Sequence, residues 1–483
     1  MRIINFQLVL FFLAAFILAS CYKDKGNYSY NEVNQVSIKA DTPDEITVAI
    51  QDTLRINITL DQTMTSPAGY EYDWTLYQNI GAPLTRWVLG TSQNLNAQIT
   101  QTPGQYLLDY FVRDKETGVS FRKKFTINVI SKFNEGWLMI EETSGNCDLV
   151  MIAPNGSVFK DIYSSANKGE KLPGGSHRVT VVRDRLGVQK IYVISPNSLT
   201  QPYFVDFLKV AGFEDQFWGA PSIVKPQDYF IGGGSNELLI NNGYPHGMNT
   251  FVPPPYKLGM QAPGTWDVEP YYIYSTSRGF MLYDKLSQSY FRYNLADMVP
   301  IAPPPPTAVF NVNEVGKKML FTGSTAGTNY FASVFRNNDD DSLFVYTLDA
   351  AAAQPAVDTA FIPGENAPGL STGRHFVSSP LLPHLYYISD NLVYLLDIPA
   401  RQARLVYAFP AGTEVTAMKM YVNTKLSSDP DNNRLIGIAT RETETGKFYT
   451  FPTDATGDFI GNTYRDEYTG FGRINDIIFK SAP

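Results

Sequence analysis

The chain has 483 residues and a formal net charge of −8 at pH 7, with 39 Lys and Arg against 47 Asp and Glu. It contains no basic block, so no nucleic-acid partner is expected, because such binding depends on Lys and Arg neutralising phosphates. Aromatic residues make up 13% of the chain, and 36 Gly and 31 Pro accompany them, a composition typical of short strands and turns.

The N-terminus has the features of a secretory signal peptide. Arg2 is the only charged residue before Cys21, and residues 9–18 (VLFFLAAFIL) form an apolar run. The run is too short for a comfortable membrane span, which needs about 20 apolar residues. Residues 1–20 are therefore predicted to be cleaved as a lipoprotein signal peptide.

A cysteine follows the apolar run directly. LASC (residues 18–21) resembles the bacterial lipobox, in which a peptidase cuts before the cysteine and the thiol is acylated. Acylated Cys21 would anchor the protein, since each buried methylene contributes about 0.8 kcal/mol. Residues 21–32 form a linker in which Lys23 and Asp24 resemble the export signal of surface lipoproteins of Bacteroidota. We expect a lipid-anchored outer-membrane protein that faces the cell exterior.

Residues 33–132 contain short strand patterns separated by turns. In DTLRINITL (52–60), apolar and polar residues alternate, which indicates a strand with one buried face. Trp74 lies in the middle of YEYDWTLYQN (70–79) and is expected in the core. About seven such strands over about a hundred residues predict an immunoglobulin-like β-sandwich.

Two motifs in this region point to a family. PGQYLLDYFVRD (103–114) resembles the G-x-Y-x-x-x-x-x-V-x-D segment of PKD domains, and the strand of Trp74 resembles their Trp-bearing strand. With CYKDKGNYSYNEVNQVSI (21–38), these motifs resemble the PKD-like lipoproteins of Bacteroidota. The resemblance implies a surface lipoprotein, often encoded near TonB-dependent outer-membrane transporters, and implies no particular reaction.

From residue 133 on, an apolar strand, a turn of Gly, Ser or Asn and a second apolar strand recur with a period of about fifty residues. The copies span residues 136–156, 190–207, 228–243, 271–294, 318–349, 384–409 and 432–454. This period predicts a β-propeller over residues 133–483, because a ring of blades covers the faces that one blade leaves exposed. About seven blades are expected, with six or eight as alternatives. A second pair of β-sandwiches is the competing fold.

Three further segments and Cys147 carry structural expectations. Residues 472–480 (GRINDIIFK) are expected to complete the first blade and lock the ring. Proline runs at 251–259 and 301–310 are predicted to connect blades, since proline cannot donate to a strand ladder. Cys147 has no cysteine partner once Cys21 carries lipid, and we expect it to be a buried core residue.

The sequence offers no catalytic or metal-binding motif. The nucleophile elbow, H-E-x-x-H and C-x-x-C are all absent, so neither a catalytic residue nor a cofactor is predicted. Acidic clusters at 337–342 and 427–433 keep calcium open as an alternative, because Ca²⁺ is bound by several oxygen ligands. Asp and Asn in these clusters equally suit turns.

Aromatic residues in loops are the candidate ligand contacts. Trp218 and Trp266 lie among Gly and Pro outside the repeats, and Tyr244 and His246 occupy a similar loop. Exposed rings offer flat apolar faces on which sugars stack, and packing between blades is their alternative role. The predicted function is binding of a nutrient, either a glycan or a peptide, for a TonB-dependent uptake system.

Two alternative functions belong to other classes. A propeller hydrolase or lyase acting on a polymer would need converging carboxylates or a metal in the central pocket. A non-catalytic scaffold subunit of a transporter complex would show a large exposed apolar patch.

Overall fold

The computed structural model describes residues 33–50, 52–78, 85–184, 187–233, 236–251 and 253–482. In these ranges nearly all regular structure is β, with one short α-helix, α2 (Ile162–Ala166), so the predicted all-β class is confirmed. The chain divides into two compact units, residues 1–130 and 131–483. The predicted signal peptide, Cys21 and the export signal at Lys23 and Asp24 lie outside the described residues. No helix within the described ranges is long and apolar enough to cross a membrane.

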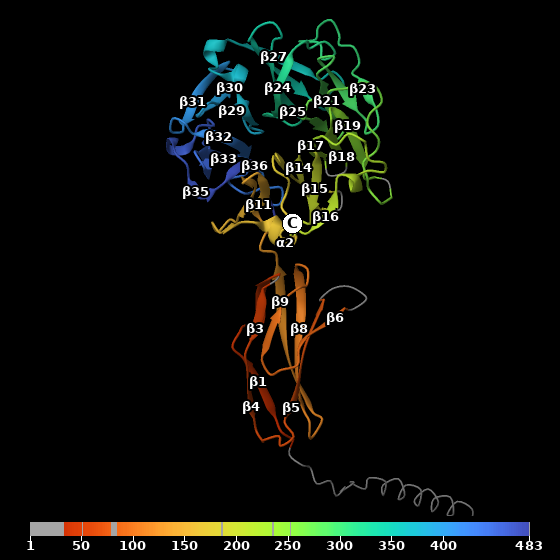
Figure 1. Ribbon diagram of the computed structural model, residues 1–483, viewed down its shortest axis with the longest axis vertical. Helices are drawn as coiled ribbons and strands as arrows, with labels where there is room; N and C mark the ends of the chain where they lie inside the picture. The colour runs from red at the N-terminus through yellow and green to blue at the C-terminus, as the bar shows by residue number, and fades with distance from the viewer. Residues whose placement is uncertain are drawn as a thin grey trace, which may run out of the picture. The chain divides into compact units, whose positions relative to one another are not determined.

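The first unit is the predicted β-sandwich. Its largest sheet has the strand order β2-β9-β8-β5-β6, and two further pairs, β1-β4 and β3-β7, complete it (Figure 1). The strands are β1 (Val36–Ala40), β2 (Glu45–Ala49), β3 (Thr53–Ile56), β4 (Ile58–Gln62), β5 (Tyr70–Gln78), β6 (Arg86–Gly90), β7 (Leu95–Gln98), β8 (Gly104–Asp114) and β9 (Ser120–Ile130).

Trp74 lies in the sandwich core, as predicted. Its side chain is fully buried, its ring stacks on Tyr110 with 4.1 Å between centroids, and its indole N–H donates to the Ser92 carbonyl at 2.9 Å. Tyr106 is also buried, and its hydroxyl donates to the Thr102 carbonyl at 2.7 Å. Trp74 and Tyr106 are therefore used for packing, and backbone carbonyls accept hydrogen bonds from their polar groups.

Asp114, the last residue of the PKD-like motif, closes the turn between β8 and β9. Its Oδ1 accepts hydrogen bonds from the Glu116 backbone N–H at 2.9 Å and from the Ser66 hydroxyl at 3.0 Å. Burial raises the pKa of Asp114, but the hydrogen bonds from Glu116, Thr117 and Ser66 outweigh burial and hold the pKa below its ordinary value. The motif therefore contains an aromatic core position and a turn-closing carboxylate.

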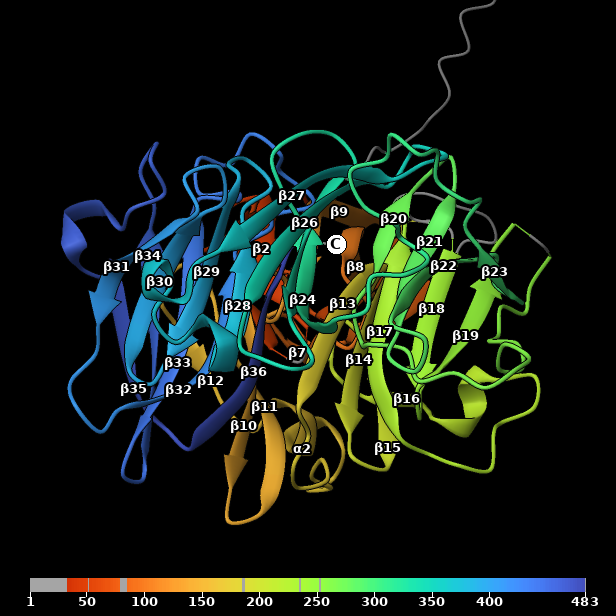
Figure 2. The same cartoon turned by 90° about the horizontal axis from the view of Figure 1, so that it is seen from above.

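The second unit is a ring of sheets, and the described residues form seven of them, so the predicted propeller and its blade number are confirmed (Figures 1 and 2). The chain passes round the ring from blade to blade, from yellow through green to blue in Figure 1.

The strands of blades two to seven are β13 (Arg178–Arg183), β14 (Gln189–Ser195), β15 (Ser198–Pro202), β16 (Lys209–Gly212); β17 (Pro226–Gly232), β18 (Asn236–Asn241), β19 (Tyr244–Asn249); β20 (Ile273–Ser275), β21 (Gly279–Asp284), β22 (Ser289–Tyr293), β23 (Met298–Pro300); β24 (Lys318–Ser324), β25 (Tyr330–Arg336), β26 (Leu343–Asp349), β27 (Ala356–Ile362); β28 (Arg374–Ser378), β29 (His384–Ser389), β30 (Leu392–Asp397), β31 (Gln402–Ala408); β32 (Glu414–Met420), β33 (Leu435–Glu442), β34 (Thr445–Pro452) and β35 (Asp466–Phe471).

The first blade joins the two ends of the unit. Its strands β10 (Gly136–Thr143), β11 (Asn146–Ile152) and β12 (Val158–Phe159) pair with the last strand, β36 (Arg473–Lys480), in the order β12-β11-β10-β36. Lys480 is buried opposite Gly136, and its Nζ donates to the Phe133 and Asn134 carbonyls at 2.8 and 2.9 Å. The predicted closing strand is confirmed, and closure removes a free sheet edge.

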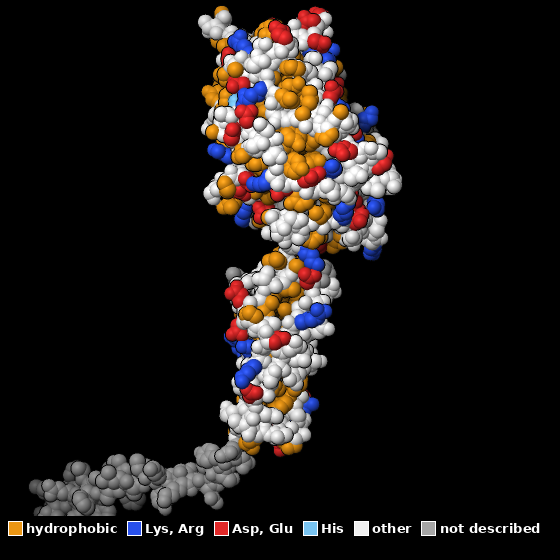
Figure 3. Space-filling view, turned by 90° about the vertical axis from the view of Figure 1, so that its left-hand side faces the viewer, with side chains coloured by type: hydrophobic (Ala, Val, Ile, Leu, Met, Phe, Trp, Pro, Cys, Tyr) orange, Lys and Arg blue, Asp and Glu red, His pale blue; other side chains and the backbone are white. Residues whose placement is uncertain are grey.

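Apolar side chains fill the space between neighbouring blades. Cys147 is fully buried there, in a cluster with Leu149 and Val179, as predicted, and burial raises the pKa of its thiol. The described parts of both proline runs lie outside the strands, between β19 and β20 and between β23 and β24. On the face in Figure 3, acidic and basic side chains are interspersed and apolar patches lie between them.

Candidate ligand-binding cavity

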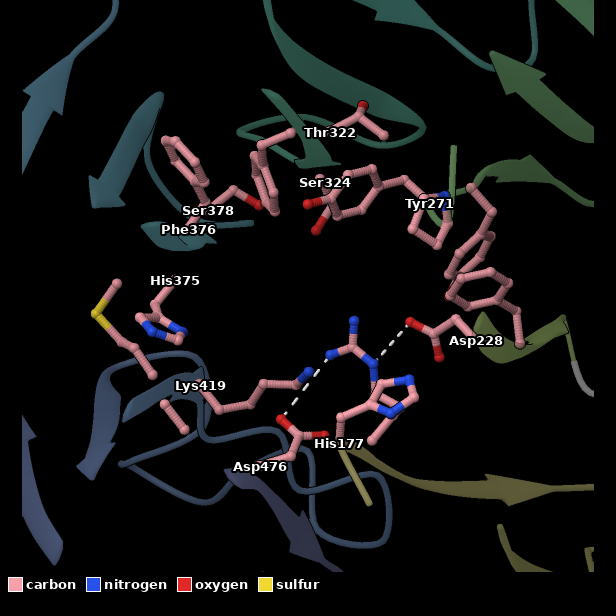
Figure 4. A pocket seen from close by; sticks show the side chains of 18 of the residues that line it. His177, Asp228, Tyr271, Thr322, Ser324, His375, Phe376, Ser378, Lys419 and Asp476 are labelled. Atoms are coloured by element: carbon pink, nitrogen blue, oxygen red, sulfur yellow. Dashed lines mark ion pairs between the residues drawn. The ribbon is translucent and has the colours of Figure 1, made fainter. Parts of the chain in front are cut away.

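A cavity of about 580 Å³ lies on the axis of the propeller. Ligand sites in proteins have volumes of about 300–1,000 Å³, so its size suits a small molecule or one part of a polymer. Every blade contributes to its wall through its innermost strand or the residues just before that strand (Figure 4). In chain order the blades' polar contributions include Arg178, Asp228, Tyr271, Ser324, His375, Lys419 and Asp476.

Five of the seven inner strands contain a β-bulge. The pairing of the inner strand with its neighbour shifts register in β17, β24, β28, β32 and β36. In β28 the shift spans His375, whose φ of 51° lies in the left-handed region. Because one extra residue reverses the alternation of a strand, a bulge can turn toward the axis a side chain that would otherwise point between blades.

Arg178 is the centre of an ion-pair network. Its Nε lies 2.9 Å from Asp228 Oδ2, and its Nη1 lies 3.9 Å from Asp476 Oδ1. Asp476 Oδ2 also accepts a hydrogen bond from the Val179 N–H at 2.9 Å, and Asp228 Oδ1 accepts one from the Tyr229 N–H at 2.8 Å. One guanidinium thus connects strands β13, β17 and β36 of three successive blades. Burial raises the pKa of Asp228, although Arg178 opposes the rise.

Lys419 brings a second cation to the same wall. Figure 4 shows its side chain extending toward the ion pairs of Arg178 and Asp476. Among the described residues, no hydrogen bond or ion pair engages its ammonium group. Burial and the charge of Arg178 lower the pKa of Lys419, while Asp476 and Asp228 partly counteract them. The cavity therefore holds one cation with two carboxylate neighbours and one cation with none in direct contact.

The opposite wall is aromatic and hydroxylic. Tyr271 meets Phe321 edge-on at 5.6 Å between centroids, and Phe321 stacks on Phe376 at 5.6 Å. Ser324 and Ser378 place their side chains on the same wall in Figure 4. Within the part of the chain that the structure describes, neither hydroxyl has a hydrogen-bond partner. A ligand that enters thus faces charges on one side and rings with hydroxyls on the other.

Two histidines complete the lining. Burial and the neighbouring Arg374 lower the pKa of His375 from 6.5 to about 4, so its imidazole is neutral at pH 7. His177 is exposed, with its Nδ1 3.3 Å from the Gly175 carbonyl. Over the described ranges, no group of three or more His, Cys, Asp or Glu is placed to hold a metal ion. Calcium binding stays an untested alternative.

The two predicted tryptophan contacts lie away from this cavity. Trp218 is 66% exposed. Trp266 is half-buried, its indole N–H donates to the Pro263 carbonyl at 2.7 Å, and its ring meets Phe291 edge-on at 5.0 Å. Trp266 therefore packs against an apolar cluster that the blades of β18 and β21 form together. Ligand binding by Trp218 is untested.

The expectation that Tyr244 and His246 occupy a loop is wrong. Both lie in strand β19, where His246 pairs with Leu239 of β18. The side chain of His246 is 1% exposed, its Nδ1 lies 3.1 Å from the Gly259 carbonyl, and Phe217 packs edge-on against it at 5.1 Å. Gly and Pro around it suggested a turn, but the strand is an outer one, where proline is tolerated. Neither residue lines the cavity.

Sequence reasoning did not single out the charged residues of the cavity. Arg178, His375 and Lys419 lie on β13, β28 and β32, three inner strands that fall between the apolar repeats. These strands turn polar side chains to the axis, so their hydrophobic pattern is weak. The available signal was a charged residue within a short strand that precedes a repeat, as in HRVTVVR (177–183) before residues 190–207 and TAMKMY (416–421) before residues 432–454.

Fold and cavity together define a propeller protein with an axial polar pocket and a preceding sandwich unit. Residues 21–175 match the sequence model of the PKD-like family, which confirms the resemblance of the N-terminal motifs. The matched range covers the sandwich and the start of the propeller. No curated protein matches the chain.

Solved structures with a similar course of the chain include proteins of Bacteroides. A quinonprotein alcohol dehydrogenase-like protein of Bacteroides thetaiotaomicron is 12% identical, with a TM-score of 0.42, and the match covers 92% of this chain and 99% of that chain. The extracellular domain of a one-component system of B. thetaiotaomicron is 10% identical, with a TM-score of 0.41, and the match covers 82% of this chain and 56% of that chain. A DUF4784 family protein of Bacteroides caccae is 12% identical, with a TM-score of 0.30, and the match covers 92% of this chain and 98% of that chain.

Proposed function

We propose that this protein is a cell-surface lipoprotein that binds a nutrient, a glycan or a peptide, in the axial cavity of its propeller. The observation that carries the proposal is the cavity wall, to which every blade contributes and in which charged, aromatic and hydroxyl groups converge. Concave sites with apolar walls and a few placed polar groups are the usual form of ligand sites. Lys419, Ser324 and Ser378 are available to a ligand, because none has a hydrogen-bond partner among the described residues.

A screen of the soluble chain from Lys23 onward on glycan and peptide arrays tests the proposal. Ser324 is exposed at the wall, so Ser324→Trp should fill the cavity without disturbing the core. Ser428→Trp, in an exposed loop between β32 and β33, is the matched control. We expect saturable binding that Ser324→Trp abolishes and Ser428→Trp preserves. Binding that survives Ser324→Trp would place the ligand elsewhere.

The anchorage and the partner form a separate part of the proposal. Acylated Cys21 would hold the protein on the outer membrane, and a TonB-dependent transporter would receive the ligand. Support comes from the LASC motif at 18–21 and from Lys23 and Asp24. Protease treatment of intact cells should cleave the protein; survival until lysis would contradict surface exposure. Affinity purification from native membranes should recover the transporter, and its absence would contradict the partnership.

A polymer-cleaving hydrolase or lyase is the second candidate, because two carboxylates, Asp228 and Asp476, converge in the cavity. We rank it lower, since Arg178 and backbone N–H groups already engage both carboxylates. Incubation of bound polymers with the protein, followed by assays for new reducing ends or amino termini, tests it. Product formation that Asp228→Asn abolishes would favour the enzyme.

A further inference from the structure

The ligand class can be argued from the chemistry of the two cavity walls. Resting on the proposed function, we infer that the cavity selects an acidic sugar, with the ligand carboxylate bound by Lys419 and the sugar ring held against the aromatic wall of Tyr271, Phe321 and Phe376. The three steps of the argument concern charge, hydroxyl groups and the ring.

The charge of the ligand follows from the two cations. Arg178 already has Asp228 and Asp476 at 2.9 and 3.9 Å, whereas Lys419 has no ion-pair partner among the described residues. The side chain of Lys419 is half-buried and faces the cavity, so a ligand carboxylate can reach its ammonium group and supply a direct ion-pair partner. Hydrogen bonds between an ammonium and a carboxylate are also among the stronger ones in proteins.

Hydroxyl groups on the ligand would suit the remaining polar atoms. Asp228 and Asp476 are acceptors when ionised, with lone pairs beyond those used by Arg178 and the backbone. Ser324 and Ser378 can both donate and accept on the opposite side. A polyhydroxylated ring offers donors to the carboxylates and acceptors to the serines at once. A peptide C-terminus carries a carboxylate but has few hydroxyls for these groups.

The aromatic wall completes the match. Tyr271, Phe321 and Phe376 form a continuous set of ring contacts along one side of the cavity. Aromatic faces are apolar and negative, so they accept the C–H face of a sugar ring. A molecule with a carboxylate at one edge and an apolar C–H face at the other could contact Lys419 and the aromatic wall at the same time.

Pairs of probes that differ only in charge test the inference. We would measure affinities by calorimetry for uronate oligosaccharides and their methyl esters, and for peptides with free and amidated C-termini. Wild type should prefer each uronate acid over its ester by at least about tenfold, as expected for a charge-assisted hydrogen bond. Lys419→Met should bind acid and ester equally, and Lys419→Arg should keep the preference. Lys209→Met, an exposed lysine on β16, is the matched control and should behave as wild type.

The outcomes separate this inference from the proposed function. Equal binding of acid and ester by wild type would overturn the acidic ligand. A preference for the acid that persists in Lys419→Met would overturn the binding of the carboxylate by Lys419. In both cases Ser324→Trp still reports whether the cavity is the site. Discrimination between free and amidated peptides with no uronate binding would overturn the sugar in favour of a peptide carboxylate. Binding of no probe of either kind would overturn the acidic sugar, and the array screen would still decide the proposed function.

Discussion

The sandwich and the propeller place buried ionisable side chains in different surroundings. In the sandwich, Asp109 pairs with Arg122 and Asp114 closes a turn, so each carboxylate has partners within the unit. Around the propeller axis, Arg178 has two carboxylates but Lys419 has no direct partner among the described residues. Two stacked sheets leave no space between them, whereas a ring of sheets meets at an axis that side chains need not fill.

This contrast separates stability from binding. The sandwich keeps its large aromatic residues in a closed core, and we expect changes there to alter stability alone. The propeller keeps its apolar residues between blades and its charges at the axis. Changes at the axis should alter both stability and ligand affinity, because the same groups join blades and face the cavity.

The largest effect is expected from the sandwich core. Trp74→Ala should destabilise the first unit by about 3–5 kcal/mol, because it removes a fully buried ring and leaves a cavity. Urea unfolding followed by hydrogen exchange in each unit measures the change. The protection of the propeller and its ligand affinity should remain at wild-type values. A parallel loss of propeller protection would show that the two units do not unfold independently.

The second largest loss of stability is expected when the ion-pair network of Arg178 is broken. Arg178→Met should destabilise the propeller by about 3 kcal/mol at pH 7, because it leaves two carboxylates without their cation. The pKa of Asp228 is already raised, so its charged form costs stability above that pKa and the cost disappears as falling pH protonates it. The deficit of Arg178→Met relative to wild type should therefore shrink between pH 7 and pH 4. A deficit that is independent of pH would contradict this account.

His375 should give the propeller a pH dependence. Its pKa is lowered from 6.5 to about 4, so the unfolded chain binds the proton first and stability falls as the pH drops through this window. The loss should be about 1–3 kcal/mol, since one pKa unit corresponds to about 1.4 kcal/mol and the side chain is only partly buried. Denaturant midpoints of wild type and His375→Asn at pH 7, 5.5 and 4.5 measure it. His177→Asn is the exposed control and should keep the wild-type slope.

The hydrogen bonds of Asp114 should contribute less to the stability of the sandwich than its aromatic core. Asp114→Ala should cost about 1–2 kcal/mol, because the Glu116 N–H and the Ser66 hydroxyl lose their shared acceptor. Asp114→Asn retains one oxygen in the same place and should recover part of the loss. Thermal unfolding of the first unit compares the two variants. Equal losses would mean that the negative charge, rather than the acceptor, supports the turn.

The smallest effect is expected at Trp218. Trp218→Ala should change stability by less than about 0.5 kcal/mol, because the ring is 66% exposed. Ligand affinity should also stay within twofold of wild type, or about 0.4 kcal/mol, since the residue lies outside the cavity wall. Calorimetric titration of the variant measures this. A marked loss of affinity would restore the loop aromatics as the binding site.

Local patterns were enough to predict the two folds. The alternation around Trp74, the motif ending at Asp114 and the apolar repeats after residue 133 depend on near neighbours in the chain, so they can be read directly. Pairing of residues 472–480 with the first blade also followed, because a ring with seven repeats needs its ends joined.

The axial cavity depended on tertiary structure. Arg178, Asp228 and Asp476 come from positions up to 298 residues apart and meet because three inner strands lie side by side at the axis. Bulges in two of those strands, β17 and β36, can change which side chains point inward, and a bulge has no local periodicity by which it could be predicted. The individual strands can therefore be predicted from the sequence. That seven of them meet at one cavity follows only from the closure of the ring.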